Sequence, residues 1–214
     1  MPSDYAKYGF IIQKGIIPKF FTDYLRKYFA NIVENNYCLT DDPQCPGSPS
    51  IYGDPAFDIA MLQITPIVED LLGKILAPQN TYARAYVKNA ELLKHTDRDE
   101  LEHSLTLALG SDPWPIYITD IDGKTHSILL EPGDAMVYQG SKLEHWREKF
   151  DGDVCYQIFM HWVDAEGEFK DLLYDGRSNL GQPSIQEQTS TGIQLEQIDF
   201  MRSMFKLLKN SVTN

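Results

Sequence analysis

Apolar side chains recur at helical spacing in two stretches near the beginning of the chain. A short apolar run at residues 8–12 predicts a first strand. Pro18 is suited to the first turn of a helix, and the pattern that follows it predicts a helix to about residue 35. Asp54 and Pro55 start a second amphipathic pattern, which ends near residue 73 or 77. Because Pro66 lies inside this pattern, we expect either two helices or one kinked helix.

The segment between these helices has no periodic pattern. Residues 36–53 contain several prolines and glycines, which predicts a long irregular loop. Long loops within compact domains are either functional lids or mobile segments, and the sequence does not favour one over the other. Tyr52, in this loop, is a candidate for covering a pocket.

Beyond Pro78 the pattern changes from helical spacing to the alternation that is typical of strands. We predict strands at residues 81–87, 102–109, 116–120, 125–130, 135–138, 143–146 and 154–162. Asp122-Gly123 and residues 131–134 predict tight turns between them. Many short strands after two helices indicate a mainly β fold with flanking helices, built as a double-sheet barrel or jelly roll.

The chain is expected to form one domain of residues 1–214. Residues 1–78 supply the N-terminal strand, helices and loop, and residues 79–164 supply the β core. Residues 165–214 supply a C-terminal loop and helix: a short helical segment near 169–173, a polar stretch at 176–191 and an amphipathic helix at 198–208.

Composition and charge exclude several classes of function. There are 19 basic and 31 acidic residues, and the resulting net charge of −12 makes a nucleic-acid substrate unlikely. No apolar run is long enough to span a membrane, and the N-terminus lacks a secretion signal. Cys38, Cys45 and Cys155 have no zinc-binding spacing; Cys38 and Cys45 could pair, but we favour free thiols in a cytoplasmic protein.

Three residues have the chemistry of a metal site. His95 and Asp97 are two residues apart, so in an extended strand their side chains point to the same face. With His145 they supply two imidazoles and one carboxylate, the facial triad of non-haem Fe(II) oxygenases. The triplet alone is a weak signal, because a motif needs its structural context.

The strand at 102–109 alternates polar and apolar residues. Its leucines, Leu105, Leu107 and Leu109, are expected to face a packed layer. Its polar residues, Glu102, Ser104 and Thr106, lie on the other face, which meets either a charged ligand inside a barrel or solvent. His103 has the parity of the leucines, which favours a structural or an outward-facing position, and His126 is expected to be exposed after its turn.

The run from Tyr82 to Asp164 resembles the catalytic core of the Fe(II)/2-oxoglutarate-dependent dioxygenases, in particular the prolyl-hydroxylase-like branch with its small phage and bacterial members. The matching residues are Tyr86, His95-Thr96-Asp97, the segment 129–135 and His145. The separation of 48 residues between Asp97 and His145 (145 − 97) is within what this family uses. The resemblance implies a double-stranded β-helix (jelly-roll or cupin-like) fold, with Fe(II), 2-oxoglutarate and O₂ as cofactor and cosubstrates.

The resemblance also implies roles for residues beyond the metal ligands. Tyr86 matches the tyrosine that contacts the far carboxylate of 2-oxoglutarate. The family's cationic partner for this carboxylate is missing, because its position, ten residues after His145, holds Cys155. We favour Arg147, whose guanidinium suits bidentate carboxylate binding, with Arg84, Gln157 and His161 as alternatives. A surface salt bridge of Arg147 to Glu144 or Glu148 is equally compatible with the sequence.

The expected function is therefore hydroxylation of an unactivated C–H bond, coupled to conversion of 2-oxoglutarate to succinate and CO₂. A carboxylate at Asp97 favours hydroxylation over halogenation, because the family's halogenases lack it. A peptidyl residue, a free amino acid or a small metabolite could each be the substrate. Arg98 could anchor an anionic substrate or pair with Asp99 or Glu102. The alternatives are a cupin-like metal-binding protein and a zinc hydrolase, neither of which turns over 2-oxoglutarate.

Overall fold

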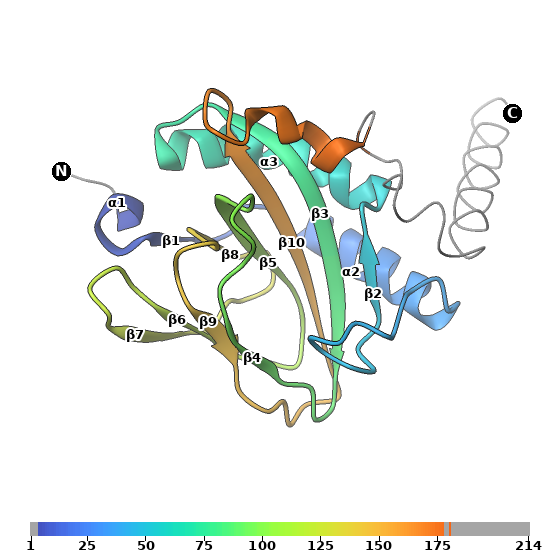
Figure 1. The fold of residues 1–214 in the computed structure, drawn as a ribbon. Helices are drawn as coiled ribbons and strands as arrows, with labels where there is room; N and C mark the ends of the chain where they lie inside the picture. Colours follow the sequence, from blue (N-terminus) through green and yellow to red (C-terminus); the bar gives the residue numbers. More distant parts are fainter. Residues whose placement is uncertain (1–3, 178–179, 181–214) are drawn as a thin grey trace, which may run out of the picture.

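Two antiparallel β-sheets of unequal size form the protein in a computed structural model that describes residues 4–177 and Leu180 (Figure 1). The major sheet has the order β1-β8-β5-β10-β3-β2, formed by Phe10–Gln13, Ala135–Tyr138, His103–Ser111, Val154–Asp164, Leu76–Val87 and Ser50–Tyr52. The minor sheet has the order β4-β9-β6-β7, formed by Leu92–His95, His145–Arg147, Ile116–Thr119 and Thr125–Ile128. The expectation of a mainly β fold with flanking helices is confirmed.

Helices cover one face of the major sheet. α2 (Lys19–Glu34) and α3 (Pro55–Leu72) lie behind β3, β5 and β10 in Figure 1, while α1 (Asp4–Tyr8) precedes β1 and the 3₁₀ segment η1 (Lys170–Gly176) follows β10. The main core fills the layer between helices and sheet, and includes Leu25, Phe29, Phe57, Met61, Leu105, Leu107, Leu109, Ile158 and Met160. The leucines of β5 therefore face a packed layer, as their alternation predicts.

The opposite face of the major sheet is polar and is turned towards the minor sheet. Because side chains alternate along a strand, the neighbours of the core residues on β3, β5 and β10 point to this inner face. They include Tyr82, Arg84, Tyr86, Ser104, Thr106, Gln157 and His161, most of them buried. A buried polar layer of this kind needs internal partners or a ligand.

The structure decides between the alternatives for the second helix and changes the bounds of two other elements. α3 is one helix through Pro66 rather than two, and it ends at Gly73, whose left-handed backbone (φ 66°) forms the C-cap. β3 begins at Leu76, before Pro78, because a bulge between His161 and Trp162 of β10 leaves Gln79 out of the pairing register. The loop 36–53 contains a strand, β2, which pairs with β3 through main-chain hydrogen bonds.

Two histidines outside the metal triplet have structural partners. His103 is buried and bonds the Tyr5 hydroxyl (2.6 Å) and the Asp164 carboxylate (3.0 Å), which fits the structural one of its two expected roles and not the outward one. His126 is half-buried rather than exposed, because Asp120 accepts a 2.6 Å hydrogen bond from its ring.

The C-terminal segment and the absence of a membrane span are the two remaining expectations. The predicted C-terminal loop and helix, apart from their first residues, lie outside the described residues, so the division of the domain into three segments stays a prediction. No helix in the described ranges is long and apolar enough to cross a membrane.

Candidate metal centre and adjoining cavity

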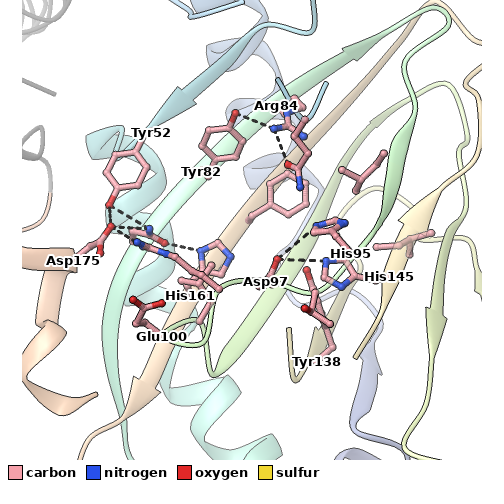
Figure 2. Close-up of a pocket in the computed structure, with 18 of the residues that line it drawn as sticks. Tyr52, Tyr82, Arg84, His95, Asp97, Glu100, Tyr138, His145, His161 and Asp175 are labelled. Atoms are coloured by element: carbon pink, nitrogen blue, oxygen red, sulfur yellow. Dashed lines mark hydrogen bonds and ion pairs between the residues drawn. The ribbon is translucent and has the colours of Figure 1, made fainter. Parts of the chain in front are cut away.

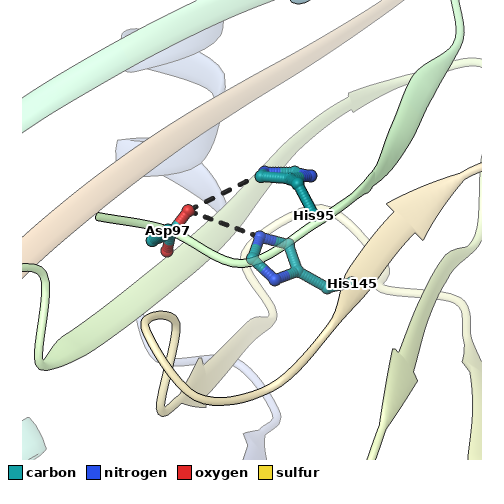
Figure 3. A group of neighbouring side chains, drawn as sticks. All are labelled: His95, Asp97 and His145. Atoms are coloured by element: carbon teal, nitrogen blue, oxygen red, sulfur yellow. Dashed lines mark ion pairs between the residues drawn. The ribbon is translucent and has the colours of Figure 1, made fainter. Parts of the chain in front are cut away.

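His95, Asp97 and His145 come together at the edge between the two sheets (Figure 3). His95 ends β4 and His145 begins β9, and the two residues are paired in register in the minor sheet. Asp97 follows two residues after β4. Asp97 Oδ1 lies 3.8 Å from His95 Nε2 and 3.5 Å from His145 Nε2. Donor atoms that share one metal ion at ~2.1 Å are separated by about 3–4 Å, so the spacing fits a bound ion.

Main-chain carbonyls fix the tautomer of both imidazoles. His95 Nδ1 is 2.8 Å from the carbonyl oxygen of Leu93, and His145 Nδ1 is 2.9 Å from that of Leu143. Because a carbonyl only accepts, each Nδ1 must carry the proton, and each Nε2 lone pair is left facing Asp97. Such outer hydrogen bonds orient the ligands of metal sites.

The carboxylate of Asp97 is held ionised and in a fixed orientation. The Ser104 hydroxyl donates a 2.8 Å hydrogen bond to Oδ2, and the Asp97 amide donates to the Gly140 carbonyl. Burial alone would raise the pKa of Asp97, but its interactions with His145 and Ser104 outweigh burial and hold this pKa well below the usual range. Burial, followed by the neighbouring His145, lowers the pKa of His95. Neutral imidazoles beside an ionised carboxylate form the donor set that a divalent transition metal binds.

Gly140 is expected to be essential to this geometry, because a side chain there would overlap the carboxylate. A Cβ built on Gly140 collides with Asp97 Oδ2 and Ser104 Oγ. We expect Gly140→Ala to fold but to lose at least about tenfold in Fe(II) affinity, the scale seen when an outer partner of a metal ligand is disturbed. Anaerobic calorimetric titration with Fe(II) measures the affinity, and Ser141→Ala is the control at the next residue. Equal affinities in Gly140→Ala and the parent protein would contradict the expectation.

A cavity of about 950 Å³ opens beside the triplet (Figure 2). Its wall includes the three candidate ligands and polar groups from β2, β3, β8, β10 and the end of η1, among them Tyr52, Asn80, Tyr82, Arg84, Tyr86, Tyr138, His161 and Asp175. Tyr138 is buried, with its ring 4.9 Å from that of His145. The sequence analysis missed Tyr138, although its alternation with Val137 gave a signal that it points inwards.

Two buried guanidinium groups flank Tyr86 at one end of the cavity. Arg84 and Arg147 are 2% and 1% exposed, and their guanidinium carbons (Cζ) lie 5.4 Å and 6.0 Å from the centre of the Tyr86 ring. Within the described ranges, the sole carboxylate paired with either group is Asp42, which binds Arg84. The Nε–H of each guanidinium is buried with no hydrogen-bond partner in the described part of the chain. Buried cations with unused donors favour an anionic ligand nearby.

The favoured cosubstrate residues take different positions relative to the cavity. Arg84 and Tyr86 line it, whereas Arg147 and Gln157 are not among its lining residues. Arg147 donates a 2.5 Å hydrogen bond to the Trp114 carbonyl and lies against the Trp114 ring. Gln157 accepts from Thr106 Oγ1 (3.2 Å) and donates to Cys155 Sγ (3.3 Å). The alternative, a surface salt bridge of Arg147 to Glu144 or Glu148, is not formed among the described residues, because this side chain is buried.

On the side of the cavity opposite His95 and His145, the lining residues belong to no recognised sequence motif. Tyr52 lines the cavity, and its hydroxyl donates to Asp175, which follows β10. Arg98 pairs with Asp175 at 2.9 Å, rather than with Asp99 or Glu102. Asp175 could not be found from the sequence, because its position depends on two consecutive residues in left-handed conformation, Tyr174 and Asp175 (φ 58° and 54°).

Comparisons with known proteins identify the fold. No protein-family model matches the sequence, and no curated protein matches it. Among solved structures, a prolyl-4-hydroxylase from Pseudomonas putida superposes with a TM-score of 0.65 at 18% identity, covering 75% of this chain and 95% of that one. HygX from Streptomyces hygroscopicus, solved with nickel, 2-oxoglutarate and hygromycin B, gives 0.61 at 13% identity, with 76% and 86% covered.

A third neighbour, EctD from S. alaskensis with bound Fe, gives a TM-score of 0.61 at 13% identity, with 75% of this chain and 74% of that chain covered. At these identities the comparisons establish the arrangement of the sheets, and they match the expectation of a double-stranded β-helix. The chain has the fold of the Fe/2-oxoglutarate-dependent oxygenases.

Proposed function

We propose that this protein is an Fe(II)/2-oxoglutarate-dependent oxygenase that hydroxylates an unactivated C–H bond and releases succinate and CO₂. The observation that carries the proposal is the convergence of His95, Asp97 and His145 on one wall of a cavity within this fold. Neighbours of the same fold were solved with Fe, and with nickel and 2-oxoglutarate. Two histidines and one carboxylate leave coordination positions open for a 2-oxo acid and O₂.

The bound iron would supply the oxidative chemistry, and the chain's own residues bind, orient and exclude water. His95, Asp97 and His145 hold the ion through lone pairs that Leu93, Leu143 and Ser104 already orient. Tyr138 closes the wall beside His145 with a buried ring. Removal of water from this side strengthens the electrostatic interactions of the carboxylate with the imidazoles.

The far carboxylate of 2-oxoglutarate is proposed to bind at the end of the cavity where Arg84 and Tyr86 form the wall. Arg84 lies opposite Gln157 in the pairing of β3 with β10, and its Nη2 donates to Asp42, Gln44 and Tyr82. Its Nε–H is unpartnered within the described ranges. Arg147, whose guanidinium carbon lies 6.0 Å from the centre of the Tyr86 ring, contributes positive charge without lining the cavity. We therefore assign the direct contact to Arg84, and a supporting role to Arg147.

Arg84→Met is expected to weaken 2-oxoglutarate binding by about 100-fold, because charge-assisted hydrogen bonds contribute roughly 1.5–3 kcal/mol and tenfold in affinity corresponds to about 1.4 kcal/mol. Arg147→Met, which keeps similar bulk, is expected to weaken it by only about tenfold. Titration of the Fe(II) protein with 2-oxoglutarate under argon measures both. Asp42→Asn, alone and combined with Arg84→Met, controls for the loss of the ion pair at Arg84. A larger effect at Arg147 would move the direct contact there, and no effect at either arginine would move it to Gln157.

The proposed substrate is a small molecule or a peptidyl residue in an aqueous compartment such as the cytoplasm. The net charge of −12 argues against nucleic acid. HygX, which has the same fold, was solved with hygromycin B, and the Pseudomonas putida neighbour is a prolyl-4-hydroxylase. These neighbours support both kinds of substrate without favouring one.

A cupin-like metal-binding protein or a zinc hydrolase is the competing function, and dependence on 2-oxoglutarate separates the classes. The test is an anaerobic titration of the protein with Fe(II) and 2-oxoglutarate, following the metal-to-ligand charge-transfer band in the visible region. An oxygenase gives a band that requires both components, and it forms succinate once O₂ is admitted. Metal binding without a band and without succinate would overturn the proposal.

A further inference from the structure

A chain of polar side chains lines the cavity on the side opposite His95 and His145. Figure 2 shows Tyr52 and Asp175 at this side, with His161 between them and Asp97. Asn80 Nδ2 lies 3.2 Å from the Tyr52 hydroxyl and 3.2 Å from Asp175 Oδ2. Asn80 Oδ1 lies 2.6 Å from His161 Nδ1. These residues come from β2, β3, β10 and the end of η1, which are joined here by side chains.

The ionisation of Asp175 determines which group donates in each hydrogen bond between these side chains. Burial alone would raise the pKa of Asp175, but its bonds to Tyr52 and Arg98 outweigh burial and lower this pKa, so the carboxylate is ionised and only accepts. The Asn80 atom that faces it must therefore be the amide NH₂. The Asn80 oxygen then faces His161 and accepts, which requires the proton of the imidazole to be on Nδ1.

His161 Nε2 is consequently left as a lone pair. His161 is 7% exposed and lines the cavity, and no described residue donates a hydrogen bond to Nε2. Burial lowers the pKa of His161 to about 4, so the ring stays neutral and keeps this acceptor. Because His161 lines the cavity, this acceptor is available to a ligand that brings a suitable donor.

The charges around His161 also favour a donor group. Glu100 lines the same side of the cavity, and its carboxylate has no ion-pair partner among the described residues, whereas Arg98 is paired with Asp175. Asp97 lies on the metal side of His161. A ligand carboxylate or carbonyl at this place would meet a lone pair and an unpaired carboxylate, and would be repelled.

We propose that His161 is a substrate-binding residue whose Nε2 accepts a hydrogen bond from an O–H or N–H group of the substrate. Asn80 is the positioning residue that holds the imidazole in this tautomer. The substrate class is a molecule that carries an alcohol, amine or amide N–H close to the carbon that reacts. The assignment of this ligand as the substrate rests on the proposed function; the tautomer of His161 does not.

The tautomer is tested directly by ¹H–¹⁵N spectroscopy of the ring nitrogens in protein labelled at histidine. The His161 signals are those that disappear in His161→Phe. We expect a protonated Nδ1 and an unprotonated Nε2 in the parent protein, and a mixture of tautomers in Asn80→Leu. A protonated Nε2 in the parent protein, or no change in Asn80→Leu, would overturn the inference.

The substrate class is tested with three probes of matched chain length, namely 1-butanol, butylammonium and butyrate. The protein is loaded with Zn²⁺, a diamagnetic ion that binds the same donor set and keeps butylammonium away from Asp97. We expect 1-butanol and butylammonium to shift the His161 Nε2 resonance towards that of a hydrogen-bonded nitrogen, and butyrate to leave it in place. An equal shift with butyrate, or no shift with any probe, would overturn the proposed class.

These outcomes are distinguishable from failure of the proposed function. The charge-transfer band in the parent protein and in His161→Phe reports on the metal and 2-oxoglutarate alone. If the parent protein gives no band, the oxygenase proposal fails whatever His161 does. If the band is present and Nε2 does not respond to the donor probes, the inference about His161 fails by itself.

Discussion

Asp97→Asn is expected to abolish the 2-oxoglutarate-dependent charge-transfer band and the formation of succinate. The substitution keeps the size of the side chain but replaces an anionic ligand with a neutral amide. Disturbing a residue that merely orients a metal ligand costs 10–100-fold in affinity, so losing the ligand itself should cost more than about 100-fold. The physical reason is that Asp97 is the one negative charge among three donors that must together hold a dication.

The control for Asp97→Asn is Asp120→Asn, which removes a carboxylate from another aspartate–histidine pair in the same protein. Asp120 Oδ2 lies 2.6 Å from His126 Nε2, and neither residue lines the cavity. We expect Asp120→Asn to retain the band at parent intensity. Circular dichroism of both variants checks that the sheets are intact. A full band in Asp97→Asn would remove this residue from the metal site.

Asp58→Leu is expected to lower the free energy of unfolding by about 3–5 kcal/mol, the cost of breaking a buried ion pair. Asp58 of α3 and Arg177, which follows η1, are both fully buried and lie 2.9 Å apart. Asp58 also accepts a 2.7 Å hydrogen bond from Thr81 of β3. Removing the carboxylate leaves the Arg177 charge in the interior without the anion that pairs with it.

The matched variant is the double substitution Asp58→Leu with Arg177→Met, which removes both charges and keeps apolar bulk. Replacing a buried pair as a whole is often neutral, so we expect the double variant to be more stable than Asp58→Leu alone. Urea unfolding of the parent, both single variants and the double variant gives the coupling energy. If the double variant is as unstable as the sum of the two single variants, the pair contributes no coupling.

The candidate metal site could be predicted from the sequence because two of its three donors are close together in the chain. Two residues of separation bring His95 and Asp97 to one face of an extended segment, and the resemblance supplied His145. The structure brings all three together. The sheet architecture could be predicted for a similar reason, since alternation marks strands and their buried face.

The other side of the cavity could not be predicted, because it depends on register between distant strands. Asn80 faces His161 only because β3 and β10 pair antiparallel over eight residue pairs, from Val154 to His161 on β10, before the bulge. Nothing in the sequence near Asn80 specifies this partner. The position of Asp175 depends on two left-handed residues, which no local pattern requires.

The position of Arg147 could be predicted from strand parity only in part. Its inward direction was expected and the side chain is buried, but the sequence could not indicate that it packs near the Tyr86 and Trp114 rings without lining the cavity. Parity gives the direction of a side chain, whereas the depth of a side chain depends on the packing around it.

The pairing of His95 with His145 has a mechanical consequence. These residues face one another where β4 pairs with β9, a pairing with an irregular register between Leu92 and His95. A metal ion held by both rings and by Asp97 would act as a cross-link between β4, β9 and the segment after β4. Loading with Zn²⁺ should therefore slow amide hydrogen exchange across the minor sheet and leave α2 and α3 unaffected, which makes the ion a part of the architecture as well as of the chemistry.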